Sequence, residues 1–207
     1  MTALIDYDAG NMRSVEKALR ALGDEPVITR DREILLRADR VILPGVGAFR
    51  DCRNNLETYG LEPVIREVIA KGTPFLGICV GMQLLFSSSE EGRELNGGEL
   101  VPGLGVFPGG VCRIPETPGL KIPHMGWNSL KIRPGTRLLK GIPEGSYVYF
   151  VHSFCAEAEG QDFEAAETEY GMRVLAAAER DNVFATQFHP EKSSETGLRI
   201  LKNFLEM

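Results

Sequence analysis

The sequence predicts an α/β protein with an open, mostly parallel β-sheet, helices on both faces, and antiparallel strands in its C-terminal half. Before residue 96, short apolar runs alternate with helical patterns. Runs that are apolar throughout are typical of strands buried on both faces, and parallel sheets need helices between their strands. After residue 96, the apolar segments have the pattern of antiparallel strands, and two of them are separated by a two-residue turn.

The N-terminal half contains the alternating elements. Asn11 is the expected N-cap of a first helix, which has an apolar face and stops at Gly23. A later helix opens at Pro63 and ends before Gly72, in agreement with the preference for proline at helix starts and glycine after helix ends. The inward-facing residues of these helices are Met12, Val15, Leu19, Leu22, Val64 and Val68. The expected strands are residues 3–5, 26–29, 41–43 and 75–78.

The C-terminal half begins with a stretch rich in glycine and proline, residues 97–135. Antiparallel strands are expected at residues 147–154, 174–179 and 183–188, with Asp181 and Asn182 forming a tight turn. A final helix has Ser193 or Ser194 as its cap. Its inward residues are Leu198, Leu201 and Leu205. Because no repeat, low-complexity tract or linker interrupts the chain, we expect a single domain over residues 1–207.

Composition excludes several function classes. The chain has 207 residues, is 43% hydrophobic and carries a net charge of −6, which disfavours binding to nucleic acid or to anionic membranes. No apolar run is long enough to span a membrane, and the N-terminus lacks a signal-peptide pattern. The four cysteines and three histidines have no metal-ligand spacing. We therefore expect a soluble protein of a reducing, cytoplasmic compartment, with no metal and no cofactor.

The segment around Cys79 has the pattern of a nucleophile elbow. Cys79 lies between Gly77 and Gly81, where an apolar run meets a helical pattern that begins at Val80. Small residues on both sides allow the sharp turn that exposes a nucleophile, and the next residue can donate its backbone N–H to an oxyanion. Cys79 is alternatively a packing residue of the core, because free cysteine is among the most buried residue types.

A second motif, His189-Pro190-Glu191, supplies a general base and a group to orient it. Proline keeps the preceding residue extended, and residues two apart in extended chain project to the same side. Taken singly, His189 is also typical of a capping or turn residue, and Glu191 of a charged surface residue. Together with Cys79 they predict a triad in which a thiolate attacks an amide or ester carbonyl.

A third segment, residues 44–47, follows the expected strand at residues 41–43. Gly45 and Gly47 leave the backbone around Val46 free to present N–H groups, although the segment also suits a simple turn. Beside an elbow at a neighbouring strand end, this loop and the Val80 N–H predict an oxyanion site. There is no phosphate-binding glycine loop of the Walker or dinucleotide type. The chain has the residues to release a group from a small acyl substrate, but none that would use that group.

With these residues in place, the chain resembles the class I, triad-type glutamine amidotransferases. Within them it is similar, along nearly its whole length, to the glutaminase subunits of imidazole glycerol phosphate synthase, the HisH family. The segments that carry the resemblance are residues 6–11, 44–49, 77–83, 122–128, 147–153 and 189–194.

The resemblance implies a flavodoxin-like open sheet and hydrolysis of L-glutamine to glutamate and ammonia, without a cofactor. Cys79 would form the glutamyl thioester, His189 would transfer the proton and Glu191 would orient His189. The substrate head group would be held by Gln83 and by the stretch His152, Ser153 and Phe154, partly through its backbone.

The resemblance also implies a partner, a (β/α)₈-barrel cyclase of the HisF family, in a heterodimer that serves histidine biosynthesis. Ammonia would pass through the barrel to a ribonucleotide intermediate. Asn11, Trp127, Asn128 and Lys192 would lie toward this partner. Trp127 also suits a buried anchor on a strand, and Lys192 suits a solvated charge.

In this family the glutaminase is nearly silent until the partner holds its ligand. The resemblance implies that the loop around Val46 turns to complete the oxyanion hole, which Gly45 and Gly47 make inexpensive. Two small departures from the family pattern are Asp8, where many members have glycine, and Phe154, where many have tyrosine.

Two other functions remain open at this point. A glutaminase of the same family that serves another synthase would have the same glutamine-binding residues. A cysteine peptidase or deglycase on a flavodoxin-like sheet would not need Gln83 and would act without a partner.

Overall fold

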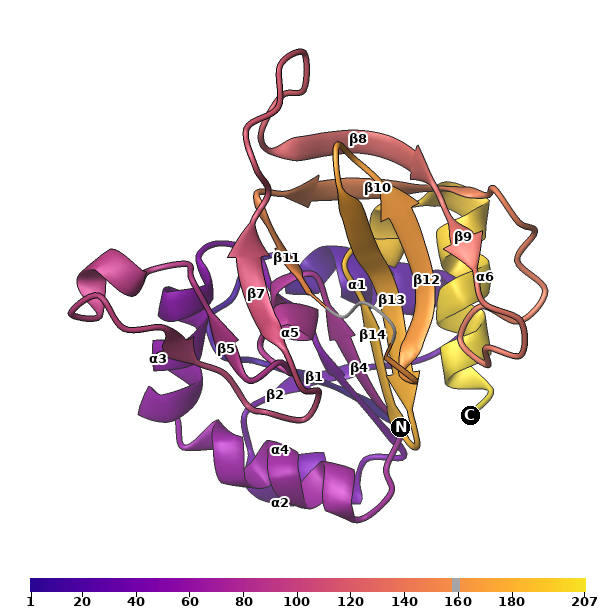
Figure 1. Ribbon diagram of the computed structural model, residues 1–207. Coiled ribbons are helices and arrows are strands. Elements are labelled where there is room, and N and C mark those ends of the chain that lie inside the picture. Colours follow the sequence, from indigo (N-terminus) through magenta and orange to yellow (C-terminus); the bar gives the residue numbers. More distant parts are fainter. Residues whose placement is uncertain (158–160) are drawn as a thin grey trace.

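Eight strands form the main sheet of the computed structural model, in the order β2-β1-β3-β4-β14-β13-β12-β9 (Figure 1). The structure describes residues 1–157 and 161–207. The strands are β1 (Thr2–Ile5), β2 (Val27–Thr29), β3 (Arg40–Leu43), β4 (Phe75–Ile78), β9 (Lys131–Ile132), β12 (Glu164–Glu169), β13 (Arg173–Arg180) and β14 (Val183–Thr186). Pairing is parallel from β2 to β14 and antiparallel from β14 to β9. The predicted mixed α/β sheet is confirmed.

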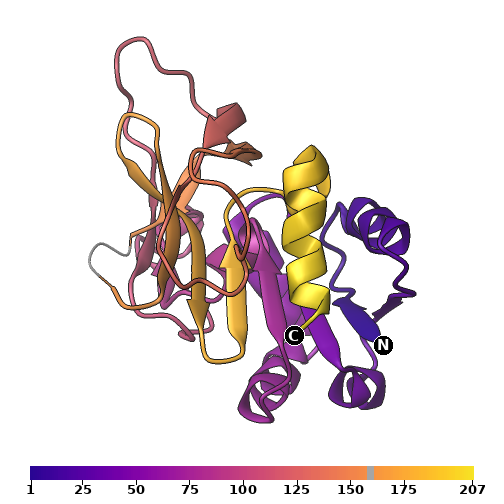
Figure 2. The same ribbon diagram turned by 90° about the vertical axis from the view of Figure 1, so that its right-hand side faces the viewer.

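Helices cover both faces of this sheet (Figures 1 and 2). On one face α2 (Arg32–Arg37) and α3 (Phe49–Thr58) pack against α4 (Leu61–Ala70). On the other, α1 (Met12–Ala21) and α6 (Ser194–Leu205) both contact the short 3₁₀ turn η2 (Pro190–Lys192). Right-handed crossovers require this division, because the chain moves from β1 to β2 in one direction and then reverses to reach β3 and β4. The remaining short helices are α5 (Val80–Gln83) and the 3₁₀ turn η1 (Arg93–Leu95).

Two smaller sheets lie beside the main one. Strands β8 (His124–Ser129) and β10 (Tyr147–His152) form an antiparallel pair across the top of Figure 1. The other sheet has the order β11-β7-β5-β6 and consists of β5 (Ser88–Ser89), β6 (Val101–Pro102), β7 (Gly110–Arg113) and β11 (Phe154–Ala156). The single strand expected over residues 147–154 is therefore two strands, because the chain leaves β8 at Ser153 and pairs with β7 instead.

The local expectations are confirmed at some positions and wrong at others. Asp181, with a left-handed φ of 52°, and Asn182 form the turn between β13 and β14 as expected. Asn11 occupies the N-cap position of α1, but its side chain makes no capping hydrogen bond. Ser193 precedes α6, yet its hydroxyl donates to the His189 carbonyl and accepts from the Tyr149 N–H. The Ser193 hydroxyl thus holds the segment around His189, and the Asn11 side chain holds the same segment by donating to Glu191.

Element boundaries differ by a few residues. Helix α4 starts at Leu61, two residues before the proline expected to open it, and β14 ends at Thr186. In α6, Leu201 is buried, whereas Leu198 and Leu205 are only partly buried against the core. Among the described residues, no helix is long and apolar enough to cross a membrane.

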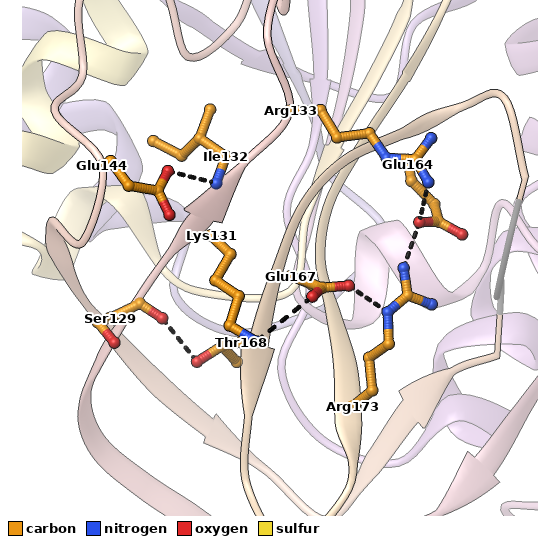
Figure 3. Close-up of polar contacts among 9 residues, drawn as sticks. All are labelled: Ser129, Lys131, Ile132, Arg133, Glu144, Glu164, Glu167, Thr168 and Arg173. Carbon is orange, nitrogen blue, oxygen red and sulfur yellow. Dashed lines mark hydrogen bonds and ion pairs between the residues drawn. The ribbon is translucent and has the colours of Figure 1, made fainter.

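The far edge of the main sheet is held by charged side chains (Figure 3). Glu164, whose side chain is buried, accepts from Arg133 at 2.6 Å and also from Arg173. Arg173 in turn pairs with Glu167, which lies 3.6 Å from the ammonium of Lys131. Each carboxylate therefore faces at least one cation, and the edge strands β9, β12 and β13 are tied together away from the site described below.

Candidate active site

Three parallel strands end at one edge of the main sheet. Leu43 of β3 is aligned with Gly77 of β4, and Thr186 of β14 is aligned with Ile78 of β4. The carboxyl ends of parallel strands meet at the same edge, which is where open α/β sheets place their ligands. The loop at residues 44–47, the Cys79 elbow and the segment that contains His189 each leave one of these strand ends.

The elbow forms because Gly77 and Gly81 allow α5 to approach both β4 and β3 closely. Cys79 has φ 55° and ψ −110°, a conformation that L-residues rarely adopt and that marks a strained functional turn. Its N–H donates to the Thr186 carbonyl at 2.7 Å. A Cβ on Gly77 would lie 2.7 Å from the Gly81 carbonyl oxygen, and one on Gly81 would lie 1.9 Å from the Leu43 carbonyl oxygen. Only glycine fits at either position.

His189 and Glu191 form a buried pair. Nδ1 of His189 lies 2.7 Å from Oε1 of Glu191, and both side chains are fully buried. The expected extended chain is only half present: His189 is extended, but Glu191 lies in the turn η2. The pair forms because this turn folds the carboxylate back under the ring. Asn11 donates to the same Glu191 oxygen at 2.5 Å and so holds the carboxylate in place.

The electrostatics of His189 favour its charged form. Burial lowers the pKa of His189, but the nearby Cys79 and the hydrogen-bonded carboxylate of Glu191 more than compensate and raise this pKa to about 9. Nε2 of His189 is buried and has no hydrogen-bond partner in the described part of the chain. With Nδ1 occupied by Glu191, Nε2 is the nitrogen left for the thiol of Cys79 and for a substrate.

A pocket of about 270 Å³ opens in front of these groups. It is lined by Val46, Gly47, Cys79, Val80, Gln83, Glu91, Pro123, Val151, His152, Ser153, Phe154 and His189. Nearly all residues expected to be catalytic, oxyanion-binding or substrate-binding therefore meet in one cavity. Glu191 lies behind His189 rather than in the wall. Gly45 is also outside the wall, where a Cβ would lie 2.7 Å from the Tyr7 hydroxyl.

The loop at residues 44–47 is held by the side chains of Tyr7, which follows β1, and of Cys52 on α3. The Tyr7 hydroxyl donates to the Pro44 carbonyl at 2.6 Å. The Cys52 thiol lies 3.7 Å from the Val46 carbonyl oxygen and donates to it. Burial raises the pKa of Cys52 to about 11, so this thiol keeps its proton near neutral pH. The Val46 carbonyl is thus turned toward Cys52 on α3.

Two buried amides, Gln83 and Gln187, connect the pocket wall to the Cys79 sulfur. Nε2 of Gln83 donates to the Phe154 carbonyl at 2.8 Å and to Oε1 of Gln187 at 3.0 Å. Nε2 of Gln187 lies 3.7 Å from the Cys79 sulfur. Both N–H groups of Gln83 are therefore satisfied within the protein, and only its Oε1 is left to accept a hydrogen bond from a ligand.

Two neutral histidines lie on the other side of the same carbonyl. His152 Nδ1 is 2.9 Å from the Phe154 oxygen, which only accepts, so His152 carries its proton on Nδ1. Its Nε2 then accepts from His124 Nδ1 at 3.0 Å, and His124 Nε2 accepts from Asn128 at 3.3 Å. Burial lowers the pKa of His124 to about 4 and that of His152 to about 3, so both rings are uncharged near pH 7.

Gln187 and Glu91 were not predicted from the sequence. Gln187 lies two residues before His189, and the alternation of extended chain would have indicated a side chain on the same side. Glu91 carries no such signal, since it follows a two-residue strand in an irregular region. Its carboxylate accepts from the Phe49 N–H at 2.8 Å, and burial raises its pKa. No group of three potential metal-ligating side chains was found among residues 1–157 and 161–207.

The four residues expected to face a partner differ in how exposed they are. Trp127 is 50% exposed, so its interpretation as a buried anchor is wrong. Lys192 is exposed, and Asn128 is partly buried through its contacts with His124. Asn11 points into the site, toward Glu191.

The sequence model of the family described as "Glutamine amidotransferase class-I" matches residues 3–207. Together with the thiol, imidazole and carboxylate gathered at the strand ends, this match places the chain in the class-I glutamine amidotransferase family. Within that family it belongs with the proteins named "Imidazole glycerol phosphate synthase subunit HisH". It is 52% identical to the one from Caldanaerobacter subterraneus subsp. tengcongensis, over 100% of this chain and 98% of that protein. It is 50% identical to the one from Geobacter metallireducens, over 98% of this chain and 96% of that protein.

Solved structures share the fold at much lower identity. A structure described as "Crystal structure of glutamine amidotransferase" matches with a TM-score of 0.74 and 23% identity, covering 99% of this chain and 97% of that chain. The structure of PurLQS from Thermotoga maritima matches with a TM-score of 0.71 and 20% identity, over 99% and 97% of the two chains. These likenesses concern the fold alone.

Proposed function

We propose that this chain is the glutaminase subunit of an imidazole glycerol phosphate synthase. It hydrolyses L-glutamine through a thioester on Cys79 and supplies ammonia to a partner cyclase in histidine biosynthesis. The names of the full-length relatives support this role. The observation that carries the chemistry is that Cys79 and His189 line one pocket, while Glu191 holds the far nitrogen of the imidazole.

The reaction has two steps. The Cys79 thiolate attacks the carboxamide carbon, and the resulting oxyanion accepts hydrogen bonds from the Val80 N–H and the loop around Val46. His189 protonates the departing nitrogen from Nε2, so the C–N bond breaks, ammonia leaves and a glutamyl thioester remains. Water then attacks the thioester with His189 as base, which releases glutamate and restores the thiol.

Three groups in the pocket suit the head group of glutamine. The free Oε1 of Gln83 and the carboxylate of Glu91 are acceptors for an α-ammonium group. We assign the α-carboxylate to the stretch of residues 152–154, because His152, Ser153 and Phe154 all line the pocket. Phe154 lines the pocket with an apolar ring, so a hydroxyl contact at this position is missing.

The loop at residues 44–47, which we propose completes the oxyanion site, also gives a structural reason for control by a partner. The Val46 carbonyl is held by the Cys52 thiol, and turning the peptide between Val46 and Gly47 requires this contact to break. Gly47 has φ 102°, which only glycine adopts readily, so the peptide on its N-terminal side has freedom to turn. In the proposed cycle, the ligand-bound partner drives this turn and completes the oxyanion hole.

The proposed partner is a (β/α)₈-barrel cyclase of the HisF family, in a heterodimer. The exposed side chains of β8 and β10 support a docking face: Met125 is 61% exposed, Trp127 50% and Tyr147 59%. Lys192 is exposed and follows Glu191 directly in the chain, so we also assign it to the side that faces the partner. We propose a cytoplasmic location, because Cys79 must stay a free thiol and all four cysteines are free. We also propose one domain, since a single buried cluster spans both halves of the chain.

The test is glutamate release from L-glutamine with and without the cyclase and its ribonucleotide ligand. Release that rises on adding the cyclase, with nitrogen appearing in the cyclase product, supports the proposal. Cys79→Ala should abolish release, while Cys112→Ala, which changes a half-buried thiol on β7, should leave it intact. Equal turnover with and without the cyclase would contradict control by the partner. Release without transfer into the product would indicate a different synthase.

A further inference from the structure

We propose that Gln187 is a positioning residue for Cys79, whose buried amide donates a hydrogen bond to the sulfur and stabilises it as a thiolate. The proposal rests on the proposed function only in taking Cys79 as the nucleophile. Gln187 is fully buried and follows directly after β14. It lies behind the pocket wall rather than in it, so its effect on catalysis passes through Cys79.

The backbone of Gln187 is fixed. Its N–H donates to the Ala176 carbonyl of β13 at 2.9 Å, and β13 pairs with β14 over the preceding residues. The side chain therefore leaves a rigid strand end. A buried amide needs partners at both of its ends, and Gln187 has Gln83 at one and the Cys79 sulfur at the other.

The direction of these hydrogen bonds follows from one carbonyl. The Phe154 carbonyl only accepts, so the group of Gln83 that lies 2.8 Å away must be its NH₂. The second hydrogen of that NH₂ points to Gln187 at 3.0 Å, which requires the oxygen of Gln187 at that end. The NH₂ of Gln187 is then the end that faces sulfur, at 3.7 Å. The orientation of both amides is thus set without reference to the thiol.

The Phe154 carbonyl, which fixes the orientation of Gln83, accepts a second hydrogen bond from His152. His152 donates to the Phe154 oxygen from Nδ1, and the chain of donors continues through His124 to Asn128 on β8. A carbonyl oxygen has two lone pairs, and Gln83 and His152 occupy both. Neither amide is free to reverse unless this whole chain of hydrogen bonds is broken.

An N–H donor aimed at Cys79 favours the charged sulfur. A hydrogen bond to an ionised acceptor is stronger than one to a neutral acceptor, and the difference is larger in a buried site. When the thiol gives its proton to Nε2 of His189, the negative charge left on sulfur faces the Gln187 NH₂. Once the thioester forms, the sulfur is neutral and the donor has less effect. Gln187 therefore acts on the free enzyme, before glutamine is attacked.

The test is the pH profile of alkylation of Cys79 by iodoacetamide in the full-length chain, read by mass spectrometry of the peptide that contains Cys79. Gln187→Met keeps the side-chain length and removes the donor. We expect the midpoint of the profile to rise by roughly one pH unit and alkylation below that midpoint to slow about 10-fold. The reading needs no glutamine turnover, so failure of this proposal and failure of the proposed function are distinguishable.

A matched control separates this effect from general loss of stability. Asn203 on α6 is another buried amide, donating to the Leu138 and Lys140 carbonyls at 2.9 and 2.8 Å. Asn203→Leu should lower the melting temperature and leave the Cys79 profile unchanged. A folded Gln187→Met variant with the profile of the unmodified protein would overturn the proposal.

A second variant keeps the test decisive if Gln187→Met does not fold. Gln83→Met leaves Gln187 in place but removes the donor that fixes its orientation. We expect a shift of the Cys79 profile in the same direction and of smaller size. An unchanged profile in this variant would contradict the proposed role of Gln187.

Discussion

At the scale of single residues, the site depends on which atom of each polar group is already occupied. Glu191 takes Nδ1 of His189, and Nε2 has no hydrogen-bond partner among the described residues. Asn11 takes the Glu191 oxygen that contacts the ring, so the carboxylate cannot rotate away. The same logic leaves Gln83 with only an oxygen to offer a ligand. Each assignment follows from hydrogen-bond partners rather than from residue type.

The first prediction concerns the charge of Glu191. Glu191→Gln keeps the shape of the side chain but removes the negative charge that helps to raise the pKa of His189 to about 9. We expect the kcat for glutamate release in the complex to fall by about 10²- to 10⁴-fold, as when the orienting carboxylate of a triad becomes an amide. The pKa of His189 should fall, and the alkaline limb of the pH profile should move to lower pH.

The control for this change is Glu195→Gln, in the exposed first turn of α6, which removes the same charge a few residues away. It should leave both kcat and the alkaline limb unchanged. If Glu191→Gln instead kept full activity with an unaltered pH profile, Glu191 would not orient His189.

The close approach of Cys79, His189 and Glu191 could be predicted from sequence because their motifs couple residue type to backbone shape. Glycines around Cys79 and proline after His189 restrict the chain in ways that are visible in the letters alone. For Gln187 the only signal is its spacing of two residues from His189. Its partner Gln83 is 104 residues away, and their hydrogen bond exists only once β4 and β14 are adjacent. Glu91 was missed because an acidic residue in an irregular segment is far more often a solvated charge.

At the scale of elements, the strands of the parallel half could be predicted within a residue or two, because buried strands are short continuous apolar runs. The small sheet could not. Its strands β5 and β6 are two residues long, and β6 and β7 lie within the stretch rich in glycine and proline. Strands this short are defined by the strands with which they pair. Two residues are too few to show an alternating pattern in the sequence.

The second prediction concerns the contact between β3 and the elbow helix. Gly81→Ala would place a Cβ 1.9 Å from the Leu43 carbonyl oxygen, and backbone cannot yield there without moving β3 or α5. We expect a loss of roughly 3 kcal/mol or more in the free energy of unfolding, measured by urea denaturation. Glutaminase activity should fall with it, because the same movement displaces Cys79.

Gly23→Ala is the matched glycine control. Gly23 ends α1 with φ 84°, and nothing lies within 4 Å of its added Cβ. The free energy of unfolding of this variant should fall by only about 1 kcal/mol, which is the cost of the left-handed conformation for alanine. Equal losses for the two variants would mean that the close approach at Gly81 is not what restricts this position.

At the scale of the whole molecule, the buried histidines give the stability opposite dependences on pH. His189 has a raised folded-state pKa, so its contribution is complete below about 6.5 and is lost as the pH rises toward about 9. His124 and His152 have folded-state pKa values lowered by burial to about 4 and about 3. Their neutral forms stabilise the fold above about 6.5, and this contribution is lost as the pH falls.

The third prediction follows for the acid side. Between pH 6.5 and 5, the unfolded chain takes up protons on these two histidines while the folded chain does not, so the free energy of unfolding should fall with falling pH. His124→Phe keeps the ring stacked between Phe150 and Tyr170, whose centroids lie 4.7 and 3.8 Å away, and removes one titrating group. Urea denaturation of the variant in this window should give a shallower dependence on pH, by up to one proton. Most carboxylates titrate below this window, so they contribute little to the difference. An unchanged slope would mean that His124 takes up its proton equally in both states and that its burial does not keep it neutral.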